Sequence, residues 1–302
     1  MYDIKIAVFS DLHANYHAFK ACYDDAVSKG CNHFIFLGDY VSDFAEPEKT
    51  MDLVYEIRSH YPSVCLRGNR ERYMLEHEAG DLPLIPGSKS GSLLFTYEHL
   101  RKKDLEFFKS LPISDIISLG GVTFEIAHAA MENDRFYFEG NDQNTEIVFL
   151  KMQHSFLLTG HSHKQYIRSL SGKTLINPGS VGVPQGGSRW PKYAIIDIIG
   201  STFSCALQEV QYDMQDVIHS QFSCGLVDRA KYWAIGALHD MITGEEWVLR
   251  LLNQVEASGN VYDEMAWHNA AVQLGMRLTE AEIMDFYRSL HPLHSSLTIL
   301  HT

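Results

Sequence analysis

The first residues with the chemistry of a functional site are Asp11 and His13, which follow the apolar run Ile6 to Phe9. The run is typical of a strand that is covered on both faces. In an extended chain, side chains two positions apart point to the same side. We therefore expect Asp11 and His13 to face one point beyond the carboxyl end of a strand, where open α/β sheets commonly bind ligands.

Further carboxylate, amide and imidazole side chains end other apolar segments. The full set of candidate metal ligands is Asp11, His13, Asp39, Asn69, His128, His161 and His163. Oxygen and imidazole ligands without cysteine suit Mn, Fe or Zn better than a thiolate-selective metal. Seven ligands are too many for one tetrahedral ion, but they fit two ions that share a bridging carboxylate. Such a pair of ions activates water and stabilises the attacking and leaving oxygens of phosphoryl transfer.

Each of these residues also has a plain structural interpretation. Asp39 and Asn69 follow glycines, where turn residues are common, and His128 follows a strand, where a histidine often packs in the core. The pair His161 and His163 is harder to explain in this way, because Gly-His-x-His directly follows an apolar run. The joint placement of all seven at the ends of apolar segments favours the metal interpretation.

The elements that must position these residues alternate between strand and helix at the start of the chain. Strands are expected at 6–9, 33–37 and 63–66, with helices at 14–29 and from Pro47 between them. Farther along, we expect a helical hairpin at 90–110, a helix at 146–153, a strand at 156–159, and hairpins within 116–127, 166–176 and 193–210. The pattern predicts an α/β fold in which two sheets pack face to face with helices outside.

The chain divides by pattern near residue 212. We expect a catalytic domain at 1–212 and a helical extension at 213–302 that packs on the core or mediates oligomerisation. Thr243 and Thr279 are each followed three residues later by glutamate, which predicts that two helices begin there with capping boxes.

Composition narrows the classes of function. The 302 residues carry a net charge of −13, which disfavours binding to a nucleic-acid polymer. The odd number of cysteines, five, and the lack of a CxxC pair indicate free thiols in a reducing compartment, so we expect a cytoplasmic protein. No apolar run approaches membrane-spanning length, and we expect no membrane partner.

Taken in order, the motifs Asp11-x-His13, Gly38-Asp39, Gly68-Asn69, His128 and Gly160-His161-x-His163 resemble those of the calcineurin-like metallophosphoesterase superfamily. The run Asn177-Pro-Gly-Ser-Val-Gly182 resembles the small bacterial phosphoesterase branch. The resemblance covers about residues 4–210 and implies a four-layer α/β/β/α sandwich. It also implies that Asp11, His13 and His163 hold a first metal ion, that Asn69, His128 and His161 hold a second, and that Asp39 bridges them.

One position departs from the family pattern. The family usually reads Gly-Asn-His-Glu/Asp, whereas this chain has Gly68-Asn69-Arg70-Glu71. Arginine cannot protonate a leaving group at neutral pH, but it can stabilise charge on phosphate oxygens. We therefore expect a preference for leaving groups that need no proton, unless His17 or His99 supplies one. Glu71 is expected to orient Arg70 or to cap a helix.

The sequence thus predicts a hydrolase of small, nucleotide-like phosphorylated substrates, with dinucleoside polyphosphates or phosphodiesters favoured. The expected catalytic residues are Arg70, Asp39 and His128, and the expected substrate contacts are Arg70, Asn177 and Arg189. The alternatives are a serine/threonine protein phosphatase, a non-catalytic metal-binding scaffold such as the retromer subunit, and a nuclease of the Mre type. The scaffold alternative predicts missing ligands, and the nuclease alternative predicts a basic groove.

Overall fold

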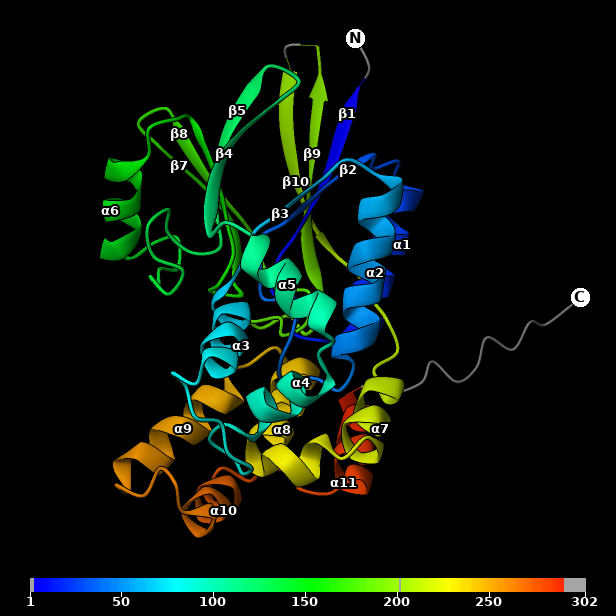
Figure 1. The fold of residues 1–302 in the computed structure, drawn as a ribbon, viewed down its shortest axis with the longest axis vertical. Helices are drawn as coiled ribbons and strands as arrows, with labels where there is room; N and C mark the ends of the chain where they lie inside the picture. The colour runs from blue at the N-terminus through cyan, green and yellow to red at the C-terminus, as the bar shows by residue number, and fades with distance from the viewer. Residues whose placement is uncertain (1–2, 201, 291–302) are drawn as a thin grey trace, which may run out of the picture.

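The computed structural model describes residues 3–200 and 202–290, and its strands form two five-stranded sheets (Figure 1). The first sheet has the order β10-β9-β1-β2-β3, with β1 at Ile4–Phe9, β2 at His33–Phe36, β3 at Ser63–Cys65, β9 at Lys192–Ile199 and β10 at Thr202–Glu209. The second has the order β4-β5-β6-β8-β7, with β4 at Ser114–Leu119, β5 at Val122–Ala127, β6 at Phe156–Thr159, β7 at Gln165–Leu170 and β8 at Lys173–Pro178.

Strand β1 shows why the sequence gives a layered structure. Its side chains alternate between two cores. Ala7 and Phe9 belong to the core under the outer helices, whereas Ile6 and Val8 belong to the core between the two sheets. A strand with a fully buried core layer on each side must be apolar at every position, as the predicted run is.

Helices cover both outer faces of the sandwich, which confirms the four-layer fold (Figure 1). Helices α1 (Tyr16–Ser28) and α2 (Pro47–His60) lie on the first sheet, and α6 (Gln143–Lys151) lies on the second. The predicted helical hairpin is α4 (Gly91–His99) followed by α5 (Lys102–Ser110). Helix α3 (Asn69–Ala79) was not predicted as an element, because its polar sequence has only one fully buried apolar residue, Met74.

The sheets are more mixed than the sequence pattern indicated. The last hairpin, β9–β10, returns to the first sheet, where β9 pairs antiparallel with β1. In the second sheet β5, β6 and β8 run parallel, although β4 and β7 join them through antiparallel hairpins. Local hairpin signals are visible in sequence, but pairing between distant strands is decided by tertiary packing.

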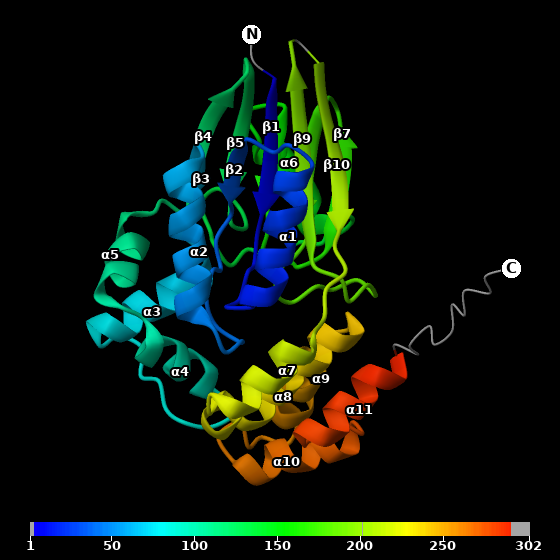
Figure 2. The same ribbon diagram turned by 90° about the vertical axis from the view of Figure 1, so that its right-hand side faces the viewer.

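The C-terminal part consists of α7 (Gln215–Ser223), α8 (Leu226–Thr243), α9 (Trp247–Ala257), α10 (Glu264–Gln273) and α11 (Glu280–Leu290). We call these five helices the extension. The carboxyl ends of β1 and β2 point toward them (Figure 2). The fully buried Trp267 lies in a core that also includes Phe44 and Val183 of the sandwich part. The predicted boundary at residue 212 stays a prediction, and residues 291–302 of the predicted extension lie outside the described residues.

The two predicted capping boxes have different outcomes. Thr279 caps α11 as predicted, since its hydroxyl accepts from Glu282 N and the Glu282 carboxylate accepts from Thr279 N. The prediction at Thr243 is wrong, because this residue ends α8. Helix α9 begins at Trp247 and is capped instead by the buried Asp240 carboxylate, which accepts from the backbone N–H groups of Trp247 and Val248.

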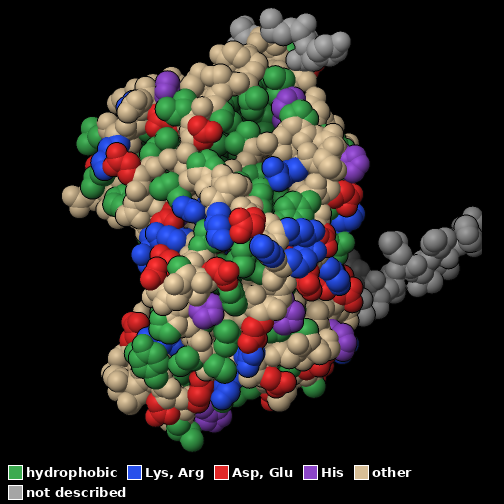
Figure 3. Space-filling model, in the orientation of Figure 1, with side chains coloured by type: hydrophobic (Ala, Val, Ile, Leu, Met, Phe, Trp, Pro, Cys, Tyr) green, Lys and Arg blue, Asp and Glu red, His purple; other side chains and the backbone are tan. Residues whose placement is uncertain are grey.

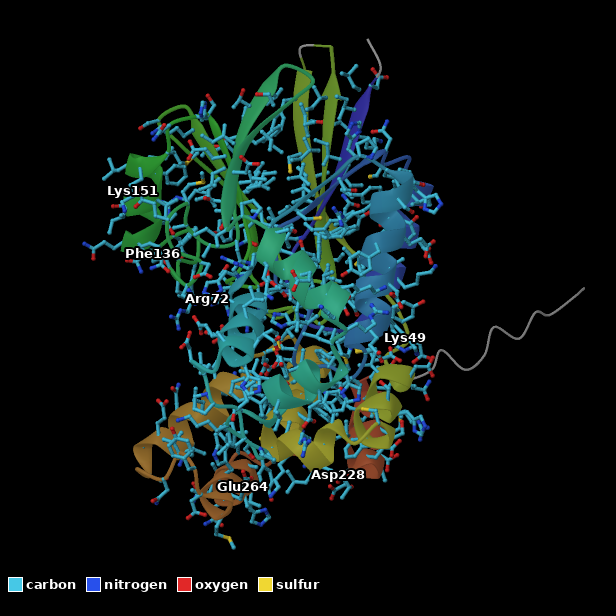
Figure 4. All side chains as sticks on the ribbon, viewed as in Figure 1. Lys49, Arg72, Phe136, Lys151, Asp228 and Glu264 are labelled. Atoms are coloured by element: carbon cyan, nitrogen blue, oxygen red, sulfur yellow. The ribbon has the colours of Figure 1, made fainter. Side chains whose placement is uncertain are left out.

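A polar contact at the far end of the extension fixes α10 against the loop before α4. Glu264 on α10, labelled in Figure 4, accepts hydrogen bonds from the backbone N–H and the hydroxyl of Ser88, each at 2.7 Å.

Across the described residues, no helix combines the length and apolar character needed to cross a bilayer.

Candidate metal centre

The loops that follow β1 and β2 are held together by backbone hydrogen bonds. Asp11 N donates to Gly38 O and His13 N donates to Asp39 O, each at 3.0 Å. The sequence predicted that Asp11 and His13 face one point because the backbone between them is extended. The predicted backbone conformation is wrong. Both lie in the left-handed region, with φ of 55° and 50°, because the chain turns sharply immediately after β1.

The same backbone conformation recurs at other candidate ligands. Asp39 has φ of 54°, His161 66° and His163 58°. Positive φ is unusual for residues with a side chain and costs about 1–3 kcal/mol at each position. Its concentration in these loops indicates that the surrounding structure imposes it, as is typical of functional sites.

Asp11, His13 and His163 form a first group of side chains whose ligand atoms lie within 4.8 Å of one another. The Nε2 atoms of His13 and His163 are 3.0 Å apart, and Nε2 of His163 is 3.4 Å from Asp11 Oδ1. Asp11 Oδ1 is buried and has no hydrogen-bond donor in good geometry among the described residues. These atoms converge on one point, which fits a cation with mixed oxygen and nitrogen ligands.

Asp39, His128 and His161 form a second such group, again within 4.8 Å of one another. Asn69 joins it, since its Oδ1 lies 3.1 Å from Nε2 of His128. The His128 Nδ1 lies 2.9 Å from the carbonyl oxygen of Leu37, which can only accept. Nδ1 therefore carries a proton, which leaves Nε2 as the ring nitrogen directed at the group, as a metal ligand requires.

The Asp39 carboxylate lies between the two groups. Its Oδ2 is 3.5 Å from Nε2 of His128 in the second group and 4.0 Å from Nε2 of His13 in the first. Its Oδ1 accepts a hydrogen bond of 2.8 Å from the backbone N–H of Arg70. This position is the one a bridging carboxylate would occupy.

Burial and charge act against each other at both aspartates. Burial alone would raise the pKa of Asp11, but the neighbouring His163 and His128 lower it to about 2. Burial also opposes ionisation of Asp39, but His128, His13 and Arg70 hold its pKa well below the usual range. Both carboxylates are therefore anionic at neutral pH, which is the form that binds a cation.

Arg70 contacts the site through its side chain, which is about 20% exposed. Its Nη2 lies 3.3 Å from Asp43 Oδ2, and its Nε lies 3.9 Å from Asp39 Oδ2. The guanidinium is thus placed beside the proposed bridging carboxylate, within reach of a group bound there. Glu71 does not orient it.

The Glu71 carboxylate instead binds backbone N–H groups of two loops. It is fully buried and accepts hydrogen bonds from the N–H groups of Gly68, Asp39 and Tyr40 at 2.8–2.9 Å. The hydrogen bond from Gly68 N makes Glu71 a cap of α3. Of the two roles expected for Glu71, the structure therefore shows the helix cap and not the orientation of Arg70. Burial, together with the nearby Asp39, raises the pKa of Glu71 to about 7.

Asn177 and Ser180 are buried supports of the ligand loops. Asn177 Nδ2 donates to Gly160 O at 2.8 Å and to Ser162 Oγ at 3.1 Å, so it holds the loop that carries His161 and His163. Ser180 Oγ donates to Asp11 O at 2.8 Å. The Asn177 side chain is fully buried and its polar atoms are already bonded, so its predicted substrate contact is not supported.

Three other residues lie apart from the two groups. Arg189 donates to the carbonyl oxygen of Leu290 at the end of α11 and stacks on Trp190. Its predicted substrate contact is therefore not supported. His17 pairs with Glu46, and His99 stacks on Phe95 of its own helix, so neither is placed to act as the missing acid.

Two residues beside the groups were not predicted from the sequence. Asp43 Oδ2 lies 2.9 Å from Nδ1 of His13, and Tyr137 lies with its ring centroid 6.2 Å from that of His161. The sequence feature that could have identified Asp43 is its position four residues after Asp39, in a loop that also contains Tyr40, Val41 and Phe44. Tyr137 gave no comparable signal, because it lies in an irregular segment between β5 and α6.

Close backbone approach explains the glycines of two motifs. A Cβ at Gly68 would lie 2.2 Å from Asp39 Oδ1, and one at Gly38 would lie 2.5 Å from Gly68 N. Only glycine permits the loops after β2 and β3 to approach this closely.

Comparison with known proteins agrees with this geometry. A model of the calcineurin-like phosphoesterase superfamily domain matches residues 4–201, so the chain belongs to the calcineurin-like metallophosphoesterase superfamily. The match includes all seven candidate ligands and ends before the extension.

The chain is also similar to individual relatives. It is 28% identical over 229 residues to an uncharacterised protein of Methanocaldococcus jannaschii, covering 70% of this chain and 88% of that protein. A hypothetical protein from Pyrococcus horikoshii shares the fold with a TM-score of 0.68 and 16% identity, over 80% of this chain and 99% of that one. A metallophosphoesterase from Sphaerobacter thermophilus gives a TM-score of 0.60 and 20% identity, over 76% and 98%.

Proposed function

We propose that this protein is a phosphoesterase that uses two metal ions to hydrolyse small phosphorylated substrates. The observation that carries the proposal is the pair of facing groups with the Asp39 carboxylate between them. One ion would be held by Asp11, His13 and His163, the other by Asn69, His128 and His161, and Asp39 would bridge them. Bound Mn, Fe or Zn would supply an activated water and would polarise the phosphoryl group.

The protein side chains would bind the phosphoryl group and stabilise its charge. Arg70 lies beside Asp39 and its side chain is about 20% exposed, so the guanidinium could contact an oxygen of a phosphate bound at the metal pair. Arg70 transfers no proton at neutral pH, and neither His17 nor His99 is placed beside the two groups to supply one. This supports substrates whose leaving group departs as an anion, such as a phenolate or a nucleotide phosphate.

The surroundings of the site support an aromatic leaving group. Tyr137 is about 44% exposed, and its ring lies edge-on to His161. The Tyr137 hydroxyl donates to Glu139, which pairs with Lys164 at 2.6 Å. A half-exposed ring held in this way offers a stacking surface for a base or an aryl group. We therefore favour dinucleoside polyphosphates and aryl phosphodiesters.

The charge distribution disfavours a polymeric substrate. On the face shown in Figure 3, the basic side chains across the middle have acidic side chains among them. Asp52, for example, pairs with Arg101 at 2.7 Å and with Lys103 at 3.2 Å. Acidic partners of this kind reduce the net positive charge that a nucleic-acid backbone would meet.

We further propose that residues 1–212 form the catalytic domain, because the candidate ligands all lie in this part of the chain.

We also propose that the protein works in the cytoplasm. None of the five cysteines forms a disulfide. Three of them, Cys22, Cys31 and Cys65, are buried, and free thiols are typical of a reducing compartment.

The proposal is tested by phosphate or nucleotide release from a substrate panel. The panel contains an aryl phosphate, an aryl phosphodiester, diadenosine tetraphosphate, an alkyl monophosphate and a phosphopeptide, each assayed after metal removal and after Mn²⁺ is restored. We expect metal-dependent cleavage that favours the anhydride and aryl substrates. Preference for the phosphopeptide would favour a protein phosphatase, and inactivity of protein with bound Mn²⁺ would favour a scaffold.

A further inference from the structure

Asp43 contacts two residues of the candidate site at once. Its side chain is 6% exposed, and its Oδ2 lies 2.9 Å from Nδ1 of His13 and 3.3 Å from Nη2 of Arg70. A carboxylate can only accept here, so His13 Nδ1 carries a proton and its Nε2 is the nitrogen directed at His163 and Asp11. Partners of this kind fix the orientation of metal-binding histidines.

Two residues of the extension donate hydrogen bonds to Asp43. The indole Nε1 of Trp233 on α8 donates to Asp43 Oδ1 at 2.8 Å. The side-chain amide of Gln221 on α7 donates to the Asp43 carbonyl oxygen at 2.9 Å. Asp43 itself has φ of 68°, so its backbone needs such support. Both donors lie outside the region that the family model matches, 4–201.

We propose that Trp233 is a positioning residue of the metal site, acting from the extension through Asp43 on His13 and Arg70. With Oδ1 held by the indole, Oδ2 is directed at the imidazole and the guanidinium. The inference rests on the proposed function. It assigns the extension a role in the site itself, in addition to its packing role.

A packing role alone makes a different prediction. Trp233 is half-buried, and its ring lies 6.5 Å from that of Trp267 in the core of the extension. Trp233→Phe keeps an aromatic ring in this core but removes the donor to Asp43. Trp247→Phe is the matched control, because the Trp247 indole donates to Thr243 Oγ1 at 3.0 Å and has no contact with Asp43.

The decisive measurement is Mn²⁺ affinity of the metal-free full chain by isothermal titration calorimetry. Removing a residue that hydrogen-bonds to a metal ligand typically weakens metal binding ~10–100-fold. Trp233 contacts Asp43 and not the ligand His13 itself, so its replacement should have a smaller effect. We expect it to weaken binding at one of two sites by about 3–10-fold, with Asp43→Asn weakening the same site more strongly. Trp247→Phe should bind as the wild type does.

The outcomes separate the inference from the proposed function. Wild-type affinity in Trp233→Phe, or equal losses in both tryptophan variants, would overturn the positioning role. A wild type that binds two Mn²⁺ ions but hydrolyses nothing on the panel would overturn the proposed function alone, and the Trp233→Phe titration would still decide the inference. A wild type that binds no Mn²⁺ would overturn both.

Discussion

At the scale of single residues, Arg70 distinguishes this chain from the usual family pattern. It places a permanent cation next to Asp39 where the family usually has a histidine. A guanidinium stabilises charge but transfers no proton at neutral pH, so it should set which leaving groups are accepted.

Arg70→His should therefore change selectivity as well as rate. An imidazole can protonate an alkoxide, and general acid catalysis is worth ~10²–10⁴-fold. We expect the ratio of alkyl to aryl phosphate turnover to rise at least about 10-fold, measured as kcat/KM for each substrate. Arg72→His on the same helix, which removes the pair with Asp134, should leave the ratio unchanged. An unchanged ratio in Arg70→His would contradict the role assigned to Arg70.

Tyr137 is expected to act on aromatic substrates only. Stacking of a base on an aromatic side chain is worth about 1–3 kcal/mol. Tyr137→Leu should raise KM for the aryl diester and for diadenosine tetraphosphate by about 5-fold or more, with no rise for the alkyl phosphate. Tyr262→Leu, which changes a tyrosine that is 72% exposed on the extension, is the control. A uniform rise in KM across the panel would argue against stacking.

At the scale of elements, the site depends on how closely the strand ends approach. The loops after β2 and β3 meet at Gly38 and Gly68, and the Glu71 carboxylate ties them together. Helix α3 thus begins at the site because its first turn is part of this junction.

Gly68→Ala should damage metal binding. The added methyl would meet Asp39 Oδ1 at 2.2 Å and must displace the carboxylate or the loop. We expect a loss of about 1–3 kcal/mol in unfolding free energy, as overpacking usually costs, and weaker Mn²⁺ binding by calorimetry. Gly121→Ala changes a hairpin glycine with φ of 85° and open space around it, so it should strain the backbone but leave Mn²⁺ affinity intact. Equal Mn²⁺ affinity in the two variants would refute the explanation.

A buried histidine should make the extension sensitive to acid. His239 on α8 is 2% exposed, and its Nε2 lies 3.0–3.1 Å from backbone atoms of Arg277. Burial lowers the pKa of His239 below its usual 6.5. The folded state therefore resists protonation, so stability is complete above pH ~6.5 and falls as the pH drops below it.

Thermal unfolding of metal-free protein at pH ~7.5 and ~5.5 tests this expectation. The midpoint should fall on acidification, and it should fall less in His239→Gln, which has no group to protonate at this position. If both proteins lose the same amount, other groups are responsible for the acid sensitivity.

At the scale of the whole molecule, the sandwich and the extension share a core. Phe44 and Val183 pack with the extension helices, and Lys164 beside the site pairs with Glu246 before α9 at 3.1 Å. A shared core is expected to couple the stability of the two parts.

The full chain should accordingly unfold in one transition. Three of the four tryptophans, Trp233, Trp247 and Trp267, lie in the extension, so their fluorescence reports mainly on that part. Far-ultraviolet circular dichroism reports on the whole chain. The two thermal midpoints should agree within about 1–2 °C, as two-state unfolding requires. An earlier fluorescence transition would show that the extension unfolds independently.

The sequence by itself determined the sandwich and the positions of the candidate ligands. Short apolar runs that stop at a small or polar residue give strands, and the polar residues after them must lie at the strand ends, whatever the pairing is. Asp11, Asp39 and the histidines could therefore be placed at strand ends from the amino-acid pattern alone. The order of the motifs then identified the superfamily.

Only the tertiary structure decided how these residues are held. The left-handed backbone at Asp11 and His13 is imposed by hydrogen bonds to the β2 loop, and local sequence does not encode it. The contact between Asp43 and Trp233 joins residues 190 positions apart. Sequence periodicity reports which face of an element is buried, but it carries no information about which distant element covers that face.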